Sequence, residues 1–173
     1  MEIRECRFER LNDPMVLAVL TAFVVIALRL ILHAIDAAPQ GADFMLVHFL
    51  AIVTVVFFNQ LRFLRKAKED AGFPHLVREG FKGAAIYALL MLLFLWWYYH
   101  AIETDAFERR VEQLVFSAVE EGQEELRVRP MIMRFFTPFN YASMSFFALL
   151  AAGVANALII GAIHHKILRR AMR

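Results

Sequence analysis

The sequence predicts an all-α membrane protein with four transmembrane helices, both termini in the cytoplasm, and an amphipathic helix on the outer surface between the third and fourth spans. Two observations lead to this prediction: four long apolar segments, and an unequal distribution of basic residues among the segments that connect them. Apolar residues make up 60% of the 173 residues, whereas soluble domains contain roughly 45–50%. A chain of this length suits one domain, so residues 1–173 are interpreted as a single four-span unit.

Four segments are long and apolar enough to cross a hydrocarbon core of roughly 30 Å, which takes about 20 residues of helix. They cover residues 14–35, 44–58, 83–102 and 139–163. The first opens with Asp13-Pro14, an N-cap followed by proline at the first helical position. It is too long, and begins too far from the N-terminus, for a cleaved signal peptide. The second is short, and helix can continue from it through Leu61 and Leu64.

Basic residues set the predicted orientation, because loops rich in Lys and Arg stay in the cytoplasm. They gather at both termini and between spans two and three: Arg4, Arg7, Arg10, Arg62, Arg65, Lys66, Lys68, Arg78, Lys82, Lys166, Arg169, Arg170 and Arg173. The loop 36–43 has none, and acids outnumber arginines between spans three and four. The aromatic run 96–99 then lies at the outer interface, where amphipathic rings are enriched. We therefore expect both termini inside.

The segment 105–121 predicts an amphipathic helix on the outer side. Apolar residues recur at helical spacing and charged residues occupy the other face. The apolar positions are Phe107, Val111, Leu114, Val115, Ala118 and Val119. Gly122 ends this helix, and Pro130 and Pro138 punctuate the return to span four. The helix is expected flat on the membrane or folded back over the span ends as a structural lid.

Span four carries a stripe of small residues that predicts a close helix–helix contact. The stripe consists of Ser145, Gly153, Ala157 and Gly161, the last three at four-residue spacing, and Asn156 lies on an adjoining face. Small residues let helix backbones approach closely in lipid, and an amide can hydrogen-bond across the contact. The contact can lie within the bundle or between subunits of a homo-oligomer.

Polar residues at the outer ends of the spans are candidates for a metal site, because ionisable groups in a membrane are costly. The five residues are His33, Asp36, His48, His100 and Glu103. Two pairs among them have i, i+3 spacing, which places both side chains on one helix face. Imidazoles and carboxylates at one depth can form a zinc or iron ligand set. The alternative is that each side chain reaches water or head groups by itself. Arg29 can pair with Asp36 or bind a lipid phosphate.

Other classes of function find no support in the sequence. It contains no glycine-rich phosphate loop, no G-x-S-x-G and no H-E-x-x-H motif, so no catalytic or cofactor-binding residue is predicted. The net charge of only +2 argues against nucleic acid as a partner. The single Cys6 cannot form an internal disulfide or a cysteine metal site. His164 and His165, beside Lys166, are expected on the surface.

The pattern resembles a bacterial family known as domain of unknown function 4199, which is common in Bacteroidota. The likeness lies in Phe81-Lys82-Gly83 before span three, the acidic outer helix around Glu120-Glu121, and Phe136-Thr137-Pro138-Phe139 before the span from Gly153 to Gly161 and its basic tail. The resemblance implies a multi-pass protein of the bacterial inner membrane without assigned activity. It also implies a polyprenyl-phosphate-type glycosyltransferase as a partner, because genes for such enzymes often accompany the family.

The leading functional hypothesis is a non-enzymatic accessory subunit or scaffold that acts through helix–helix and partner contacts, as a homo-oligomer or in a larger membrane complex. The alternative is a protein, including an enzyme, that binds a metal ion or a lipid head group through the outer-end His/Asp/Glu residues. A transporter is a weaker third possibility, since transport paths favour ionisable groups or broken helices near the midplane.

Overall fold

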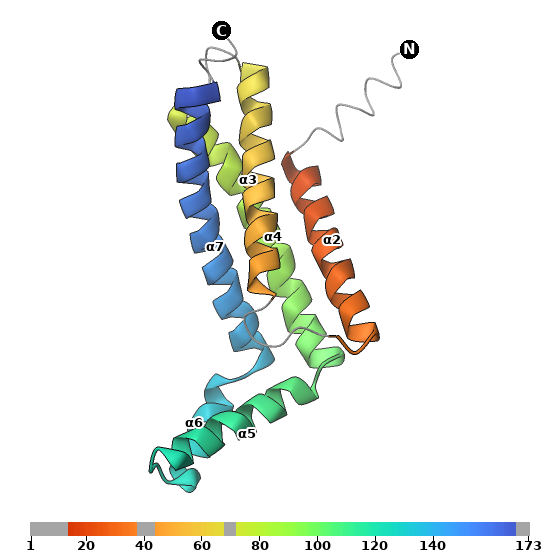
Figure 1. Cartoon of the computed structure of the whole chain (residues 1–173), viewed down its shortest axis with the longest axis vertical. Helices are drawn as coiled ribbons and strands as arrows, with labels where there is room; N and C mark the ends of the chain where they lie inside the picture. The colour runs from red at the N-terminus through yellow and green to blue at the C-terminus, as the bar shows by residue number, and fades with distance from the viewer. Residues whose placement is uncertain (1–13, 38–43, 68–71, 169–173) are drawn as a thin grey trace. The chain divides into compact units, whose positions relative to one another are not determined.

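The computed structural model describes residues 14–37, 44–67 and 72–168, and these residues are almost entirely helical (Figure 1). The order is α2 (Pro14–Ala34), α3 (Met45–Ala67), α4 (Phe73–Ala101), α5 (Asp105–Glu120), α6 (Glu125–Phe135), α7 (Pro138–Ile163) and a π-helix, η2 (His164–Leu168). The residues that lie outside the described ranges include Cys6, Lys68, most of the loop 36–43 and all the basic residues of the termini except Lys166.

Four of these helices are long and apolar enough to cross a membrane: α2, α3, α4, and α7 with the start of η2. The predicted all-helical class and the four apolar spans are therefore confirmed, and the chain is a membrane protein. The expected continuation of the second span is also confirmed, because α3 runs without a break through Leu61 and Leu64 to Ala67. The amphipathic helix predicted for residues 105–121 is present as α5.

Helix α4 begins earlier than the predicted third span, at Phe73 instead of Gly83. The added turns contain Arg78, Glu79 and Lys82, so apolar length by itself does not indicate them. Their apolar side is buried: Leu76 is fully buried against Leu64 of α3. The carbonyl of Gly72 accepts the backbone N–H groups of His75 and Leu76 at 3.1 and 3.2 Å, which fixes the first turn.

The return segment before the fourth span differs from the prediction. Pro130 was expected to punctuate the return to span four, but it lies inside α6. A proline removes the hydrogen bond to the carbonyl four residues earlier, here that of Leu126. Since Leu126 is in the first turn and 94% exposed, that carbonyl lies in an exposed part of the helix, and the helix tolerates the loss.

The chain divides into two compact units. Unit 1 comprises residues 1–90 and 147–173, and unit 2 comprises residues 91–146. In unit 1, α2 packs against α3. The buried side of α3 follows helical spacing and consists of Ala51, Ile52, Val55, Val56, Asn59, Gln60 and Leu64. The core of unit 1 therefore contains two amides among aliphatic side chains.

Unit 2 contains a helical hairpin in which α5 and α6 pack side by side (Figure 1). Val111, Val115 and Val128 form its buried interior. The turn after α5 is a Schellman motif: Gln123 N–H bonds Ala118 O at 3.0 Å and Gly122 N–H bonds Val119 O at 2.9 Å. Gly122 adopts φ 87°, which glycine reaches without steric cost, so the predicted helix end at this residue is confirmed.

Aromatic rings hold the base of the hairpin within unit 2. Tyr99 of α4 lies 5.0 Å from Phe107 of α5 and 5.1 Å from Tyr141 of α7, between ring centroids. All three rings meet edge to face, the arrangement that aromatic quadrupoles favour. Thr137 Oγ1 accepts the N–H of Asn140 at 3.2 Å and so caps the start of α7.

Candidate functional site

A polar cluster lies between three helices of unit 1, and its centre is a hydrogen bond between His48 and Tyr87. His48 Nδ1 and Tyr87 Oη are 2.8 Å apart, which joins α3 to α4. Tyr87 is fully buried and His48 is half-buried. Tyrosine usually finds a hydrogen-bond partner when it is buried. The imidazole supplies that partner here, so His48 serves first to satisfy Tyr87.

Arg29 of α2 adds a buried cation to the same unit. Its guanidinium carbon lies 5.2 Å from the centroid of the Phe44 ring, and the residue is only 4% exposed. The Phe44 ring also meets the His48 ring edge to face, with 5.2 Å between centroids. A guanidinium over an aromatic face is attracted by the ring quadrupole, more strongly where water is excluded. Phe44 therefore links Arg29 to His48, and we name these residues with Tyr87 the Arg29–Tyr87 cluster.

The five candidate metal ligands are divided between the two units. His33, Asp36 and His48 belong to unit 1, and His100 and Glu103 to unit 2. Among the residues that the structure describes, no group of three or more His, Cys, Asp and Glu side chains could hold a metal ion. The metal site therefore stays a prediction without a ligand geometry that supports it.

The i, i+3 spacing of these ligands does not put either pair on one helix face, because both helices end inside the pairs. Helix α2 ends at Ala34, and Asp36 follows in the left-handed conformation with φ 53°. Helix α4 ends at Ala101, and Glu103 N–H bonds back to Tyr98 O at 3.0 Å in the turn that follows. Neither carboxylate continues the helix face of its histidine. His100 itself is exposed and stacks on Trp96.

Three residues of the α7 stripe, Gly153, Ala157 and Gly161, are buried within unit 1, and so is the adjoining Asn156. A Cβ added to Gly153 would lie 2.6 Å from the Ala84 Cβ of α4, so the two backbones are in close contact there. The carbonyl of Ala157 accepts a hydrogen bond from Gln60 Nε2 at 2.8 Å. A Cβ on Gly161 would lie 3.2 Å from Val77. Asn156 donates to Ala152 O of its own helix at 2.8 Å, not across the contact.

Two amides of α3 take part in this packing, and the sequence analysis did not single them out. Asn59 is 3% exposed and Gln60 is fully buried. A Cβ on Gly80 of α4 would lie 2.6 Å from Gln60 Nε2, and a Cβ on Gly83 would collide with the Asn59 amide. The signal in the sequence was a polar pair at the end of an apolar span, together with two glycines three residues apart at the start of the next one.

Several polar atoms near these amides make no hydrogen bond within the described residues. They are both amide atoms of Asn59, Oε1 of Gln60 and both ring nitrogens of His164. His164 is fully buried against Phe57, with 4.8 Å between ring centroids, so its expected surface position was wrong. The expectation failed because η2 packs against α3, which covers His164. Buried polar groups of this kind are costly in a membrane.

The hairpin of unit 2 has the opposite character, since an exposed ion-pair network joins its two helices. Arg129 Nη1 donates to Glu112 Oε1 at 2.6 Å, and Arg129 Nη2 donates to Glu112 Oε2 at 3.0 Å and to Glu125 Oε1 at 2.8 Å. These bonds lower the pKa of the Glu112 carboxyl and raise that of Arg129. The bidentate pair joins α5 to α6 across the hairpin.

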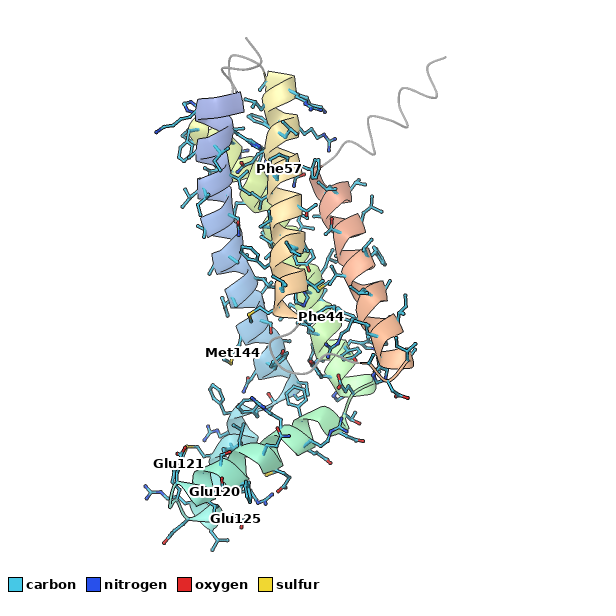
Figure 2. The ribbon with its side chains drawn as sticks, in the orientation of Figure 1. Phe44, Phe57, Glu120, Glu121, Glu125 and Met144 are labelled. Carbon is cyan, nitrogen blue, oxygen red and sulfur yellow. The ribbon has the colours of Figure 1, made fainter. Side chains whose placement is uncertain are left out.

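The turn end of the hairpin exposes apolar and acidic side chains together. We define the hairpin tip as residues 116–127. Phe116 is 65% exposed and Leu126 is 94% exposed, and Val119 lies between them in sequence. Glu120, Glu121 and Glu125 gather around the same turn (Figure 2), and Glu124 is also exposed. Large apolar residues at full exposure beside charges are typical of an interaction surface.

Comparisons with family models, with curated proteins and with solved structures found no match. The resemblance to the domain of unknown function 4199 therefore stays a prediction.

Proposed function

We propose that this protein is a non-enzymatic accessory or scaffold protein of a bacterial inner membrane, which holds a partner protein through the α5–α6 hairpin. The observation that carries the proposal is the hairpin tip, where Phe116 and Leu126 are largely exposed although the hairpin has a buried interior of its own. The Arg129–Glu112 pair and the Schellman turn at Gly122 fix its shape. A preformed surface loses less conformational entropy on binding than a flexible loop.

The packing of the spans supports the same proposal. The part of the α7 stripe from Gly153 to Gly161 is buried within unit 1, against α4 at Gly153 and near Gln60 of α3 at Gly161. This stripe therefore makes contacts within unit 1, and the hairpin is the remaining candidate surface for a partner protein. The expected orientation places the hairpin on the outer side of the membrane. A polyprenyl-phosphate-type glycosyltransferase, the partner class that the family resemblance implies, is the first candidate to test.

A second candidate function, binding of a lipid head group, is favoured by the Arg29–Tyr87 cluster. A buried arginine within a span is a costly feature that usually marks a functional position. Arg29 and the His48–Tyr87 hydrogen bond bring a cation and two polar side chains into one unit. This arrangement would recognise an anionic or hydroxylated head group at the end of a lipid. It involves one of the five predicted outer-end residues, His48.

Photo-cross-linking in living cells tests the scaffold proposal. We would replace Leu126, and separately Phe23, with p-benzoylphenylalanine. Phe23 is a matched control because it is 64% exposed on α2, a span. The proposal expects a protein adduct of one defined mass from position 126 and none from position 23. Lipid adducts alone at both positions would contradict it, and mass spectrometry of the adduct would identify the partner.

Cysteine labelling tests the orientation on which the proposal depends. In a Cys6→Ser background, a membrane-impermeant maleimide should label Gln123→Cys in intact spheroplasts. It should label Lys66→Cys only after lysis. Both positions are exposed, so access of the reagent is limited by the membrane and not by burial. The reverse pattern would place the hairpin in the cytoplasm and remove an extracytoplasmic partner from consideration.

A further inference from the structure

We infer that the hairpin tip binds a cationic, amphipathic segment of its partner protein. The inference rests on the proposed scaffold function and names the chemistry of the surface that this function would recognise. The hairpin tip exposes three large apolar side chains: Phe116, Val119 and Leu126 are 65%, 42% and 94% exposed. Apolar side chains of this size gain free energy when a partner covers them, about 25 cal/mol per Å² of buried area.

The charge of the tip selects the partner. Glu120, Glu121, Glu124 and Glu125 lie within six residues, against the single Arg127. Of the four glutamates, Glu125 is paired with Arg129, whereas no ion pair joins Glu120, Glu121 or Glu124 to a basic side chain in the described part of the chain. Their negative charge attracts basic groups and repels acidic ones, which steers association and excludes wrong partners.

The spacing of the two features predicts the form of the partner segment. Phe116 and Val119 lie in the last turn of α5, and Leu126 lies in the first turn of α6, so the acidic turn falls between the apolar positions. A segment that covers both helix ends must present apolar residues with basic residues beside them. An amphipathic helix with Lys or Arg next to its apolar face meets this requirement.

Two other occupants fit less well. A second copy of this chain carries most of its basic residues at its termini and between spans two and three, which the expected orientation puts on the opposite side of the membrane. Its outer segment, between spans three and four, has more acids than arginines. The bilayer surface offers a place for apolar side chains, but a surface with anionic lipids repels the glutamates of the tip. Charge complementarity therefore favours a basic protein segment over both.

Peptide binding to the purified full chain tests the inference. The probe is a fluorescent eighteen-residue helix of Lys and Leu at amphipathic spacing, and the protein is held in phosphatidylcholine nanodiscs. We expect saturable binding by anisotropy that weakens as salt is raised, above the signal of empty nanodiscs. Combined Glu120→Gln, Glu121→Gln and Glu124→Gln should weaken it about tenfold, which corresponds to roughly 1.4 kcal/mol. Leu126→Asn should weaken it without changing the salt dependence.

The control variant is Glu108→Gln, an exposed change on α5 more than three helical turns from Glu120. It should change the affinity less than about twofold, within the usual effect of a remote surface charge. Equal binding to the triple variant, to Leu126→Asn and to the intact protein would overturn the inference. So would equal binding of a Glu/Leu peptide. All substituted positions are exposed, and circular dichroism checks that the variants stay folded.

Two results separate this inference from the scaffold proposal. If cross-linking at position 126 finds a protein whose attached segment is acidic or uncharged, the scaffold stands and the inference fails. If a fluorophore on Leu126→Cys enters phosphatidylglycerol nanodiscs in the absence of peptide, and cross-linking finds only lipid, the tip is a membrane anchor and both fail. A cross-linked segment rich in Lys or Arg supports both.

Discussion

Polar side chains that join helices are buried in the core of unit 1 and exposed in the hairpin of unit 2. In unit 1, Gln60 and Tyr87 are fully buried, and each makes one hydrogen bond to another helix. In the hairpin, Arg129 joins two glutamates in the open, with its own side chain 36% exposed and that of Glu112 62% exposed. The first arrangement excludes solvent from the polar contact, and the second shares the contact with solvent.

The difference determines what each region contributes. An exposed ion pair is worth about 0–1 kcal/mol because water and salt screen it, so the hairpin can exchange its own pairs for those of a partner at little cost. A buried polar group that loses its partner costs about 1–3 kcal/mol. Unit 1 therefore resists change at Gln60 and Tyr87, whose hydrogen bonds join its helices.

The largest loss of stability is expected where the backbones of α4 and α7 are in close contact. Gly153→Leu should destabilise the protein by about 1–3 kcal/mol, because its Cβ would lie 2.6 Å from the Ala84 Cβ and neither backbone can give way. Thermal unfolding in detergent measures the change. Ala155→Leu is the matched control, since Ala155 is exposed on the same helix. Equal melting of both variants would mean that the α4–α7 contact does not limit stability.

A smaller loss is expected from Tyr87→Phe, which removes the hydroxyl and leaves His48 Nδ1 without this hydrogen bond. The cost should be about 1–2 kcal/mol, as for other buried polar groups that lose a partner. Tyr141→Phe serves as the comparison, because Tyr141 is only half-buried. If the two tyrosine variants unfold at the same temperature, the His48–Tyr87 bond is not a fixed part of the core.

In the hairpin, Gly122→Ala should cost about 1 kcal/mol of local stability, because an alanine at φ 87° is strained. The change tests the backbone alone, since no atom lies within 4 Å of an added Cβ. Hydrogen exchange of the α5 and α6 amides would report it as faster opening of the hairpin. Gly122→Asn should lose less, because asparagine tolerates this conformation better; the opposite order would exclude backbone strain as the cause.

The smallest effect is expected from Arg129→Met, which removes the hydrogen bonds that lower the pKa of Glu112. A carboxyl whose folded pKa is lowered adds stability above its unfolded pKa and loses it as the pH falls through the folded pKa. The intact hairpin should therefore weaken below about pH 4.5, the ordinary value for this carboxyl. The variant should lack this step, and NMR titration of the Glu112 carboxyl should return to the ordinary pKa. An unchanged titration would show that the ion pair does not form in solution.

The sequence by itself determined the class of protein and the main helices. Apolar length fixes the four spans, since only a helix satisfies its own backbone in lipid. The helical spacing of apolar residues predicts α5, and Gly122 predicts its end. Both signals can be recognised in the sequence because they depend only on residues close together in the chain. The small-residue stripe of α7 was also visible as a packing surface, although its neighbours were not.

Tertiary structure decided which polar residues come together. Nothing local to His48 indicates Tyr87, which is 39 positions away, and nothing local to Gln60 indicates Ala157, 97 positions away. The early start of α4 and the helix around Pro130 also depend on neighbours, because Leu64 buries Leu76 and α5 packs along α6. A periodic pattern of apolar or small residues shows that one face of a helix will be buried. Which residues cover that face is determined only when distant helices pack together.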